Sequence, residues 1–282
     1  MRTQHMNSLL HQHTESIVSA AIHAVLPDVA VVRALQGYRF GTGKIVLVAA
    51  GKAAWQMANA ASDCLGDRIA DGVVVTKYGH IKGPIAHIRC FEGGHPVPDD
   101  GSCRGTQAAL DLVQGLTAQD TVVFLLSGGG SALLEKPLIP LDELQDITQQ
   151  LLGCGADIVE INTIRKRLSA VKGGRFAMAC APAQVLCVVL SDVLGDPLDM
   201  IASGPACADS STCKDAENVV KKYGLQLSAD ALACLRKETP KQIANVTTRI
   251  TGSVRELCAA AADAAQALGY APILLTDQLA CQ

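Results

Sequence analysis

The sequence FLLSGGGSALLE, Phe124 to Glu135, changes character at its centre and decides the fold class. The apolar run before Ser127 is typical of a buried strand, and the segment after Ser131 predicts the first turn of a helix. Three consecutive glycines, Gly128 to Gly130, form the junction. Their N–H groups can point together at an anion, reinforced by the helix N-terminus. The alternative is a tight turn that allows close packing.

Apolar runs and helical patterns alternate on both sides of this junction. We expect strands at residues 44–50, 72–76, 87–92, 122–126, 185–190, 248–251 and 272–276. We expect helices at residues 8–26, 101–114, 142–152, 157–179 (with a Gly-Gly break), 216–223, 229–237 and 254–268. This order predicts an α/β fold, a mostly parallel sheet with helices on both faces in three layers. We interpret residues 1–282 as one large domain.

Composition excludes several classes of protein. The 282 residues are 49% hydrophobic and only 3% aromatic, which suits close packing of helices on a sheet. The net charge of −3 argues against a nucleic-acid or membrane surface. No apolar run approaches the ~20 residues of a membrane span, and the N-terminus is too polar for a signal peptide. We therefore expect a cytoplasmic protein, whose eleven cysteines form no CxxC pair and remain reduced.

Three of the expected strands end in turns that carry chemistry. These turns are Gly51-Lys52, Ser127 to Ser131, and Ser191-Asp192. Because parallel strands end at the same edge of a sheet, we expect the three turns to face one cleft. Phosphoryl transfer needs an anion cradle, a cation such as Lys52, and a carboxylate such as Asp192 that holds Mg²⁺ or takes a proton. The alternatives are a solvated lysine and a turn or N-cap aspartate.

Two further segments carry candidate ligand contacts. In INTIRKRLSAVKGGRFA, residues 161–177, a polar stripe contains Asn162, Arg165 and Lys166. Arginine and lysine at this density suit carboxylate or phosphate recognition, although a solvated basic face gives the same pattern. His95 lies in the turn-rich loop GGHPVPDDG, residues 93–101, and either contacts the ligand or packs locally.

The common nucleotide-binding signatures are absent from the sequence. Gly51-Lys52 has neither the earlier glycine nor the following Ser or Thr of a Walker A loop. The Gly-rich junction has Leu133 where GxGxxG requires its third glycine. A P-loop and a standard dinucleotide site are therefore both disfavoured.

The chain resembles the glycerate 2-kinases of the MOFRL type. The matching segments, in order over nearly the whole chain, are VAAGKAAWQMA, VVTKYGH, EGGHPVPDD, LLSGGGSALLE, EINTIRKRLSAVKGGRFA and LSDVLGDPLDMIASGP. The resemblance implies a kinase that phosphorylates D-glycerate with ATP and Mg²⁺, commonly at the 2-hydroxyl. It also implies two α/β domains, a large Rossmann-like one and a smaller C-terminal one, with the active site between them.

The resemblance assigns roles to individual residues. The family's active-site lysine falls on Lys52. Its SGGGSA loop is Ser127, Gly128, Gly129, Gly130, Ser131 and Ala132, its NTxRK segment is residues 162–166, and its SDVxGDP segment is residues 191–197. The assignment of Asp192 as a metal or base carboxylate is inferred from its chemistry.

The chain also departs from the family pattern. Family members are longer, so we expect residues 1–282 to be the large N-terminal domain without the smaller one, and turnover to be impaired. Ala206 stands in place of the threonine of SGPT, and Val254 in place of the asparagine of GSN. The alternatives are an NAD(P)H-dependent hydroxypyruvate reductase and a non-catalytic anion-binding remnant. The sequence leaves open the 2- or 3-phosphoglycerate product, the ligand of the Gly-rich loop, and the oligomeric state, a homodimer included.

Overall fold

The computed structural model describes residues 2–191, 195 and 197–277. Its helices are α1 Arg2–Ala24, α2 Pro27–Leu35, α3 Ala54–Leu65, α4 Asp100–Val113, α5 Gly130–Leu133, α6 Leu141–Gly153, α7 Ile158–Arg167, α8 Arg175–Ala179, α9 Cys213–Tyr223, α10 Ala229–Leu235 and α11 Val254–Ala267. Its strands are β1 Ile45–Ala50, β2 Ile69–Lys77, β3 Ile88–Gly93, β4 Thr121–Leu126, β5 Gln184–Leu190 and β6 Val246–Thr251. Short 3₁₀ turns occur at Gly66–Arg68 and Ile201–Ser203.

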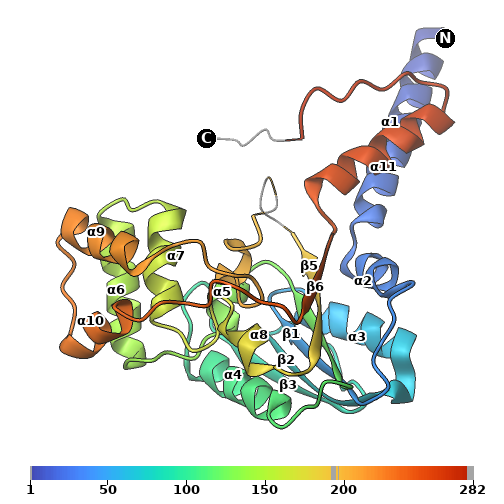
Figure 1. Ribbon diagram of the computed structural model, residues 1–282. Helices are drawn as coiled ribbons and strands as arrows, with labels where there is room; N and C mark the ends of the chain where they lie inside the picture. The colour runs from blue at the N-terminus through green and yellow to red at the C-terminus, as the bar shows by residue number, and fades with distance from the viewer. Residues whose placement is uncertain (1, 192–194, 196, 278–282) are drawn as a thin grey trace.

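The strands form one parallel sheet in the order β3-β2-β1-β4-β5-β6 (Figure 1). Every residue of β1 and β4 is buried, as the continuous apolar runs of central strands predict. Helices α2 and α3 cover one face of the sheet, and α4, α5 and α8 cover the other. The α/β class and the three layers expected from the sequence are confirmed.

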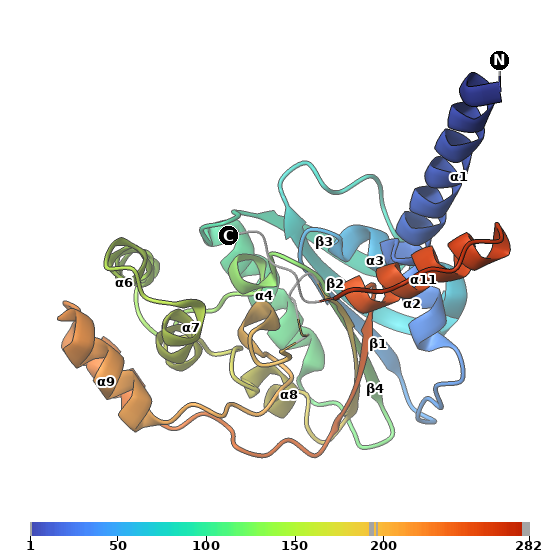
Figure 2. The same ribbon diagram turned by 90° about the horizontal axis from the view of Figure 1, so that it is seen from above.

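Helices α6, α7, α9 and α10 pack together at one side of the sheet, away from α1 (Figures 1 and 2). They enclose an apolar core of their own, which includes Leu144, Ile164, Val219 and Leu235. Capping boxes begin two of these helices, with Asp157 at the start of α7 and Thr212 at the start of α9. This helical cluster therefore has defined ends and its own core beside the sheet.

Helices α1 and α11 lie side by side and project from the sheet (Figures 1 and 2). Arg33 of α2 joins them to the body through an ion pair with Glu256 of α11, at 2.7 Å. Within the described residues no single helix is long and apolar enough to cross a membrane, although the bent pair Ser8–Ala24 and Pro27–Leu35 reaches that length and composition.

Three expected elements differ in the structure. The expected helix 8–26 ends at Ala24, and Pro27 starts a separate helix, α2, that the sequence analysis missed. The expected helical region 157–179 is split into α7 and α8 by residues 168–174. The expected strand 272–276 is wrong, because this segment pairs with no strand and leaves Ile273 and Leu275 83% and 90% exposed. An apolar run forms a strand only where a sheet edge is within reach.

Candidate active site

The turns after β1 and β4 are joined by backbone hydrogen bonds at the carboxyl edge of the sheet. The Lys52 N–H donates to the Gly128 carbonyl oxygen at 2.9 Å, and the Ala53 N–H donates to the Ser127 hydroxyl at 3.1 Å. Gly51 has a φ of +126°, and a Cβ there would lie 2.2 Å from Ser127 Oγ. Only glycine fits that position. The strand order reverses between β1 and β4, which is where open α/β sheets bind ligands.

His95 and Lys52 bracket the middle glycine of the Gly-rich loop. A Cβ added to Gly129 would lie 2.9 Å from His95 Cδ2 and 3.1 Å from Lys52 Cγ. His95 reaches this point from the loop after β3, and the Lys52 side chain is exposed. The structure therefore brings Lys52 and the Gly-rich loop to one edge, as expected for parallel strands, and it places His95, whose role the sequence left open, beside them. A cation, an imidazole and glycine amides at one edge can hold an anionic group.

The helix after the glycines is shorter than the sequence suggests. Helix α5 is a single turn of four residues, so it has little dipole to reinforce anion binding at the loop. The Gly130 N–H donates to the Ser127 carbonyl oxygen at 3.2 Å, which commits one of the three glycine amides to the turn. A Cβ on Gly130 would lie 2.7 Å from Ala202 Cβ. Gly130 therefore serves the tight, closely packed turn, and anion binding by the other two glycines stays a prediction.

A chain of hydrogen bonds through two serine hydroxyls connects Asn162 of α7 to the Gly-rich loop. Ser203 Oγ donates to Asn162 Oδ1 at 2.8 Å, and Ser131 Oγ lies 3.1 Å from Ser203 Oγ. Ala202 and Ser203 have φ values of +52° and +61°, a conformation that non-glycine residues seldom adopt. This backbone places Ser203 between α7 and the Gly-rich loop. Such strain is common next to functional sites.

The side chains of Arg165 and Lys172 both donate hydrogen bonds to the backbone of the Gly-rich loop. Arg165 Nη2 donates to the Ser131 carbonyl oxygen at 3.0 Å, and Lys172 Nζ donates to the same oxygen at 2.8 Å. The buried Glu135 carboxylate lies 3.3 Å from Lys172 Nζ and 3.9 Å from Arg165 Nη2. Burial lowers the pKa of Lys172 to about 8, and the attraction of Glu135 opposes that change. Both cations therefore contact the Ser131 carbonyl oxygen and Glu135, and they stabilise the conformation of the loop.

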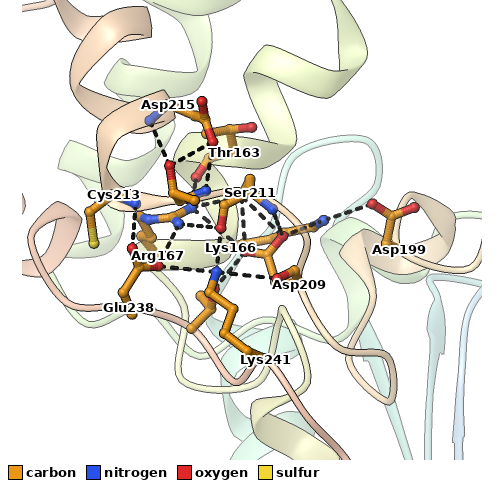
Figure 3. A network of polar contacts seen from close by, with 12 residues as sticks. Thr163, Lys166, Arg167, Asp199, Asp209, Ser211, Cys213, Asp215, Glu238 and Lys241 are labelled. Atoms are coloured by element: carbon orange, nitrogen blue, oxygen red, sulfur yellow. Dashed lines mark hydrogen bonds and ion pairs between the residues drawn. The ribbon is translucent and has the colours of Figure 1, made fainter.

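Lys166 belongs to a second polar network, which includes Asp209 and Arg167 (Figure 3). Its ammonium lies 3.1 Å from Asp209 Oδ1 and 3.5 Å from Asp199 Oδ2, and the side chain is buried. Arg167 adds contacts to Asp209 at 3.6 Å and to Glu238 at 3.2 Å. The expected stripe therefore divides, with Arg165 and Asn162 facing the loop and Lys166 facing Asp209. Sequence reasoning missed Asp209, which lies in a distant loop and belongs to no local pattern.

The proposed carboxylate Asp192, and Asp196 beside it, lie outside the described residues. Across residues 2–191, 195 and 197–277, no group of three His, Cys, Asp or Glu side chains is placed to hold a metal ion. The sequence analysis also missed His80, whose Nδ1 lies 2.9 Å from the Lys52 carbonyl oxygen. His80 is the last residue of the segment VVTKYGH, and the sequence of that segment does not show the contact with Lys52.

A pocket of about 420 Å³ adjoins Lys52 on the β2 side. The residues that line it are Lys52, Ala53, Trp55, Gln56, Gly79, His80 and Lys82. Its volume is in the range of small-molecule sites.

The fold and this edge define a doubly wound α/β protein whose candidate site lies where the strand order reverses. The chain belongs to the family of the domain of unknown function DUF4147, whose model matches residues 13–236. It is 50% identical over 94% of its length to a D-glycerate 2-kinase of Thermotoga maritima. A crystal structure of glycerate kinase from that organism superposes with a TM-score of 0.90 and 49% identity, over 93% of this chain and 64% of that one.

A relative from Agrobacterium vitis, named provisionally as a hydroxypyruvate reductase, is 41% identical over 93% of this chain. The chain spans less than two thirds of these relatives, 64% of the Thermotoga protein and 60% of the Agrobacterium one. The family resemblance stated from the sequence is confirmed.

Proposed function

We propose that this chain is the large domain of an ATP-dependent glycerate kinase that phosphorylates D-glycerate, with 2-phosphoglycerate as the product. The observation that carries the proposal is the convergence of Lys52, His95 and Gly129 at the reversal of strand order. Support also comes from the 50% identity to a protein named D-glycerate 2-kinase. We further propose a cytoplasmic location and leave a homodimer as one alternative for the assembly.

The residues of this edge suit phosphoryl transfer. The acceptor hydroxyl oxygen bonds to the γ-phosphorus as the bond from that phosphorus to the β,γ-bridging oxygen breaks, and ADP leaves. Lys52, exposed and held by the Gly128 carbonyl through its backbone, neutralises charge on the phosphoryl oxygens. Glycine amides and His95 bind and orient an acidic group beside it. Asp192 is our proposed acceptor of the hydroxyl proton.

Mg²⁺ accompanies ATP in this proposal and would neutralise phosphate charge. Holding Mg²⁺ is the alternative role that we propose for Asp192. The described part of the chain offers no acidic cluster for a cation, so no step is assigned to the metal.

The test measures ADP release and the loss of NADH absorbance in parallel, on the same purified protein. We expect slow ADP release that depends on D-glycerate, in line with the impaired turnover expected from the sequence, together with a rise in melting temperature on adding ATP with Mg²⁺. Hydroxypyruvate-dependent loss of NADH absorbance without ADP release would instead establish the reductase alternative, which the name of the Agrobacterium relative favours. Neither turnover nor a shift with any of these ligands would support a non-catalytic module.

A further inference from the structure

The pocket between the turns after β1 and β2, the Trp55 pocket, shares Lys52 with the candidate active site. The lining residues come from the Lys52 turn, the start of α3 and the loop after β2. The Gly-rich loop lies on the opposite side of β1, because β4 and β2 flank that strand. Lys52 therefore lies between the Gly-rich loop with His95 on one side and the Trp55 pocket on the other.

The Trp55 pocket is positively charged. Lys52 and Lys82 both line it, and no carboxylate is among its lining residues. Helix α3, twelve residues long, starts at the pocket, and no side chain caps its first turn. The N–H groups of that turn and the helix dipole favour a negative group there. Two carboxylates accept hydrogen bonds from residues at or beside the pocket, Asp28 from Gln56 Nε2 at 3.4 Å and Glu92 from the Ile81 N–H at 3.2 Å.

An aromatic wall makes this pocket different from a simple anion site. The Trp55 indole Nε1 donates to the Gly83 carbonyl oxygen at 2.9 Å, which fixes the ring against the loop after β2. His80 is fixed in turn by its contact with the Lys52 carbonyl oxygen. A held indole gives a planar face on which a nucleobase can stack. Glycerate has no group that would use such a face.

Resting on the proposed function, we infer that the Trp55 pocket binds the nucleotide and the Gly-rich loop binds the carboxylate of the acceptor acid. The base stacks on Trp55, and the phosphates lie between Lys82, the start of α3 and Lys52. Lys52 then meets the γ-phosphate from one side and the acceptor from the other. The roughly 420 Å³ volume is adequate for a nucleotide-sized ligand that remains open to solvent at one end.

Trp55 is the single tryptophan of the chain, so its fluorescence reports on this pocket alone. We would titrate the 282-residue protein with ADP, exciting where adenine does not absorb and correcting with free N-acetyltryptophanamide. We expect a saturable change in emission with ADP, competition by tripolyphosphate, and no saturable change with D-glycerate. A saturable change with D-glycerate and none with ADP would overturn the inference.

Two substitutions locate the phosphates and the base. Lys82→Ala removes one phosphate contact and is expected to raise the ADP Kd by about tenfold. Lys214→Ala removes an exposed lysine of α9 that pairs with its neighbour Glu217 at 3.6 Å, and it serves as the matched control. By calorimetry, Trp55→Phe should keep most of the ADP affinity, whereas Trp55→Ala should lose it. An unchanged ADP Kd in both Lys82→Ala and Trp55→Ala would contradict the assignment.

The two proposals fail in different ways. Glycerate-dependent ADP release with no effect of ADP on Trp55 emission would remove the pocket assignment and leave the kinase standing. Saturable binding of ADP in the pocket, with hydroxypyruvate-dependent loss of NADH absorbance and no glycerate-dependent ADP release, would support the pocket and remove the kinase.

Discussion

The backbone N–H of Lys52 donates to the carbonyl oxygen of Gly128 across 2.9 Å, and so links the cation of one strand turn to the glycines of the next. The lysine and the Gly-rich loop therefore keep a fixed separation, whatever the exposed side chain does. A fixed backbone position limits where the Lys52 ammonium can lie, and a charge already close to its position of use stabilises a developing anion with less rearrangement. The contact uses only main-chain atoms, so it survives any change of the Lys52 side chain.

Lys52→Met tests the cation without disturbing that backbone link. We expect the glycerate-dependent rate of ADP release to fall by ~100- to 1,000-fold, the usual loss when one group that stabilises the transition state is removed. The melting temperature should stay unchanged, because the side chain is exposed and its anchoring contact is in the backbone. Lys214→Met should change neither quantity. A wild-type rate in Lys52→Met would rule out the catalytic role.

Gly129→Ala tests whether the loop binds ligand. Gly129 has a φ of +87°, and the added Cβ would lie 2.9 Å from His95 and 3.1 Å from Lys52 Cγ. Gly155 has a φ of +75° with no atom within 4 Å, so Gly155→Ala is the matched control for backbone strain. Each variant should lose about 1–2 kcal/mol of stability in urea unfolding. Only Gly129→Ala should also lose the thermal shift with D-glycerate, and an equal loss in both variants would contradict a binding loop.

Continuous apolar runs made the central strands predictable from the sequence. Residues 44–50 and 122–126 are β1 and β4 almost to the residue, because burial on both faces leaves no polar alternation to misread. Residues 272–276 carry the same local pattern and form no strand, because pairing depends on an edge that the local sequence does not reveal. The expected helix 8–26 stops before Pro27, and no helix was expected directly after it, although proline is favoured in the first turn of a helix, where it stands in α2.

The candidate site could be predicted to the extent that topology alone fixes it. Lys52 and the Gly-rich loop follow neighbouring parallel strands, so any such sheet brings them to one edge. The direction of Lys166 depends on Asp209, which is 43 positions away in a loop of irregular structure. The sequence pattern of a basic stripe on a helix does not predict which side chains face a ligand and which pair with a buried carboxylate. The contact of His80 with the Lys52 carbonyl is equally invisible in the sequence.

Asp209→Asn tests whether the second network is structural. Asp209 is buried and lies against Lys166 and Arg167, while Thr239 Oγ1 donates to it at 2.7 Å. Removing its charge leaves two buried cations without their shared partner, and we expect a loss of about 3–5 kcal/mol in urea unfolding. Asp67→Asn, an exposed aspartate in a 3₁₀ turn, should change stability little. A loss of under ~1 kcal/mol in Asp209→Asn would mean that the ion pairs contribute little.

Glu238 makes the stability of this network depend on pH. Its pKa is lowered from 4.5 to about 2, first by the hydrogen bond from the Cys213 N–H and then by its contact with Lys241. A carboxylate with a lowered pKa stabilises the folded state fully above its unfolded pKa and loses that contribution as the pH falls through the folded one. The contribution should therefore be complete above pH 4.5 and fade toward pH 2. Because the side chain is 48% exposed, we expect at most about 1 kcal/mol from it. Melting curves of wild type and Glu238→Gln should differ at neutral pH and converge in acid, whereas a gap that stays constant from neutral pH into acid would show that ionisation of Glu238 does not stabilise the fold.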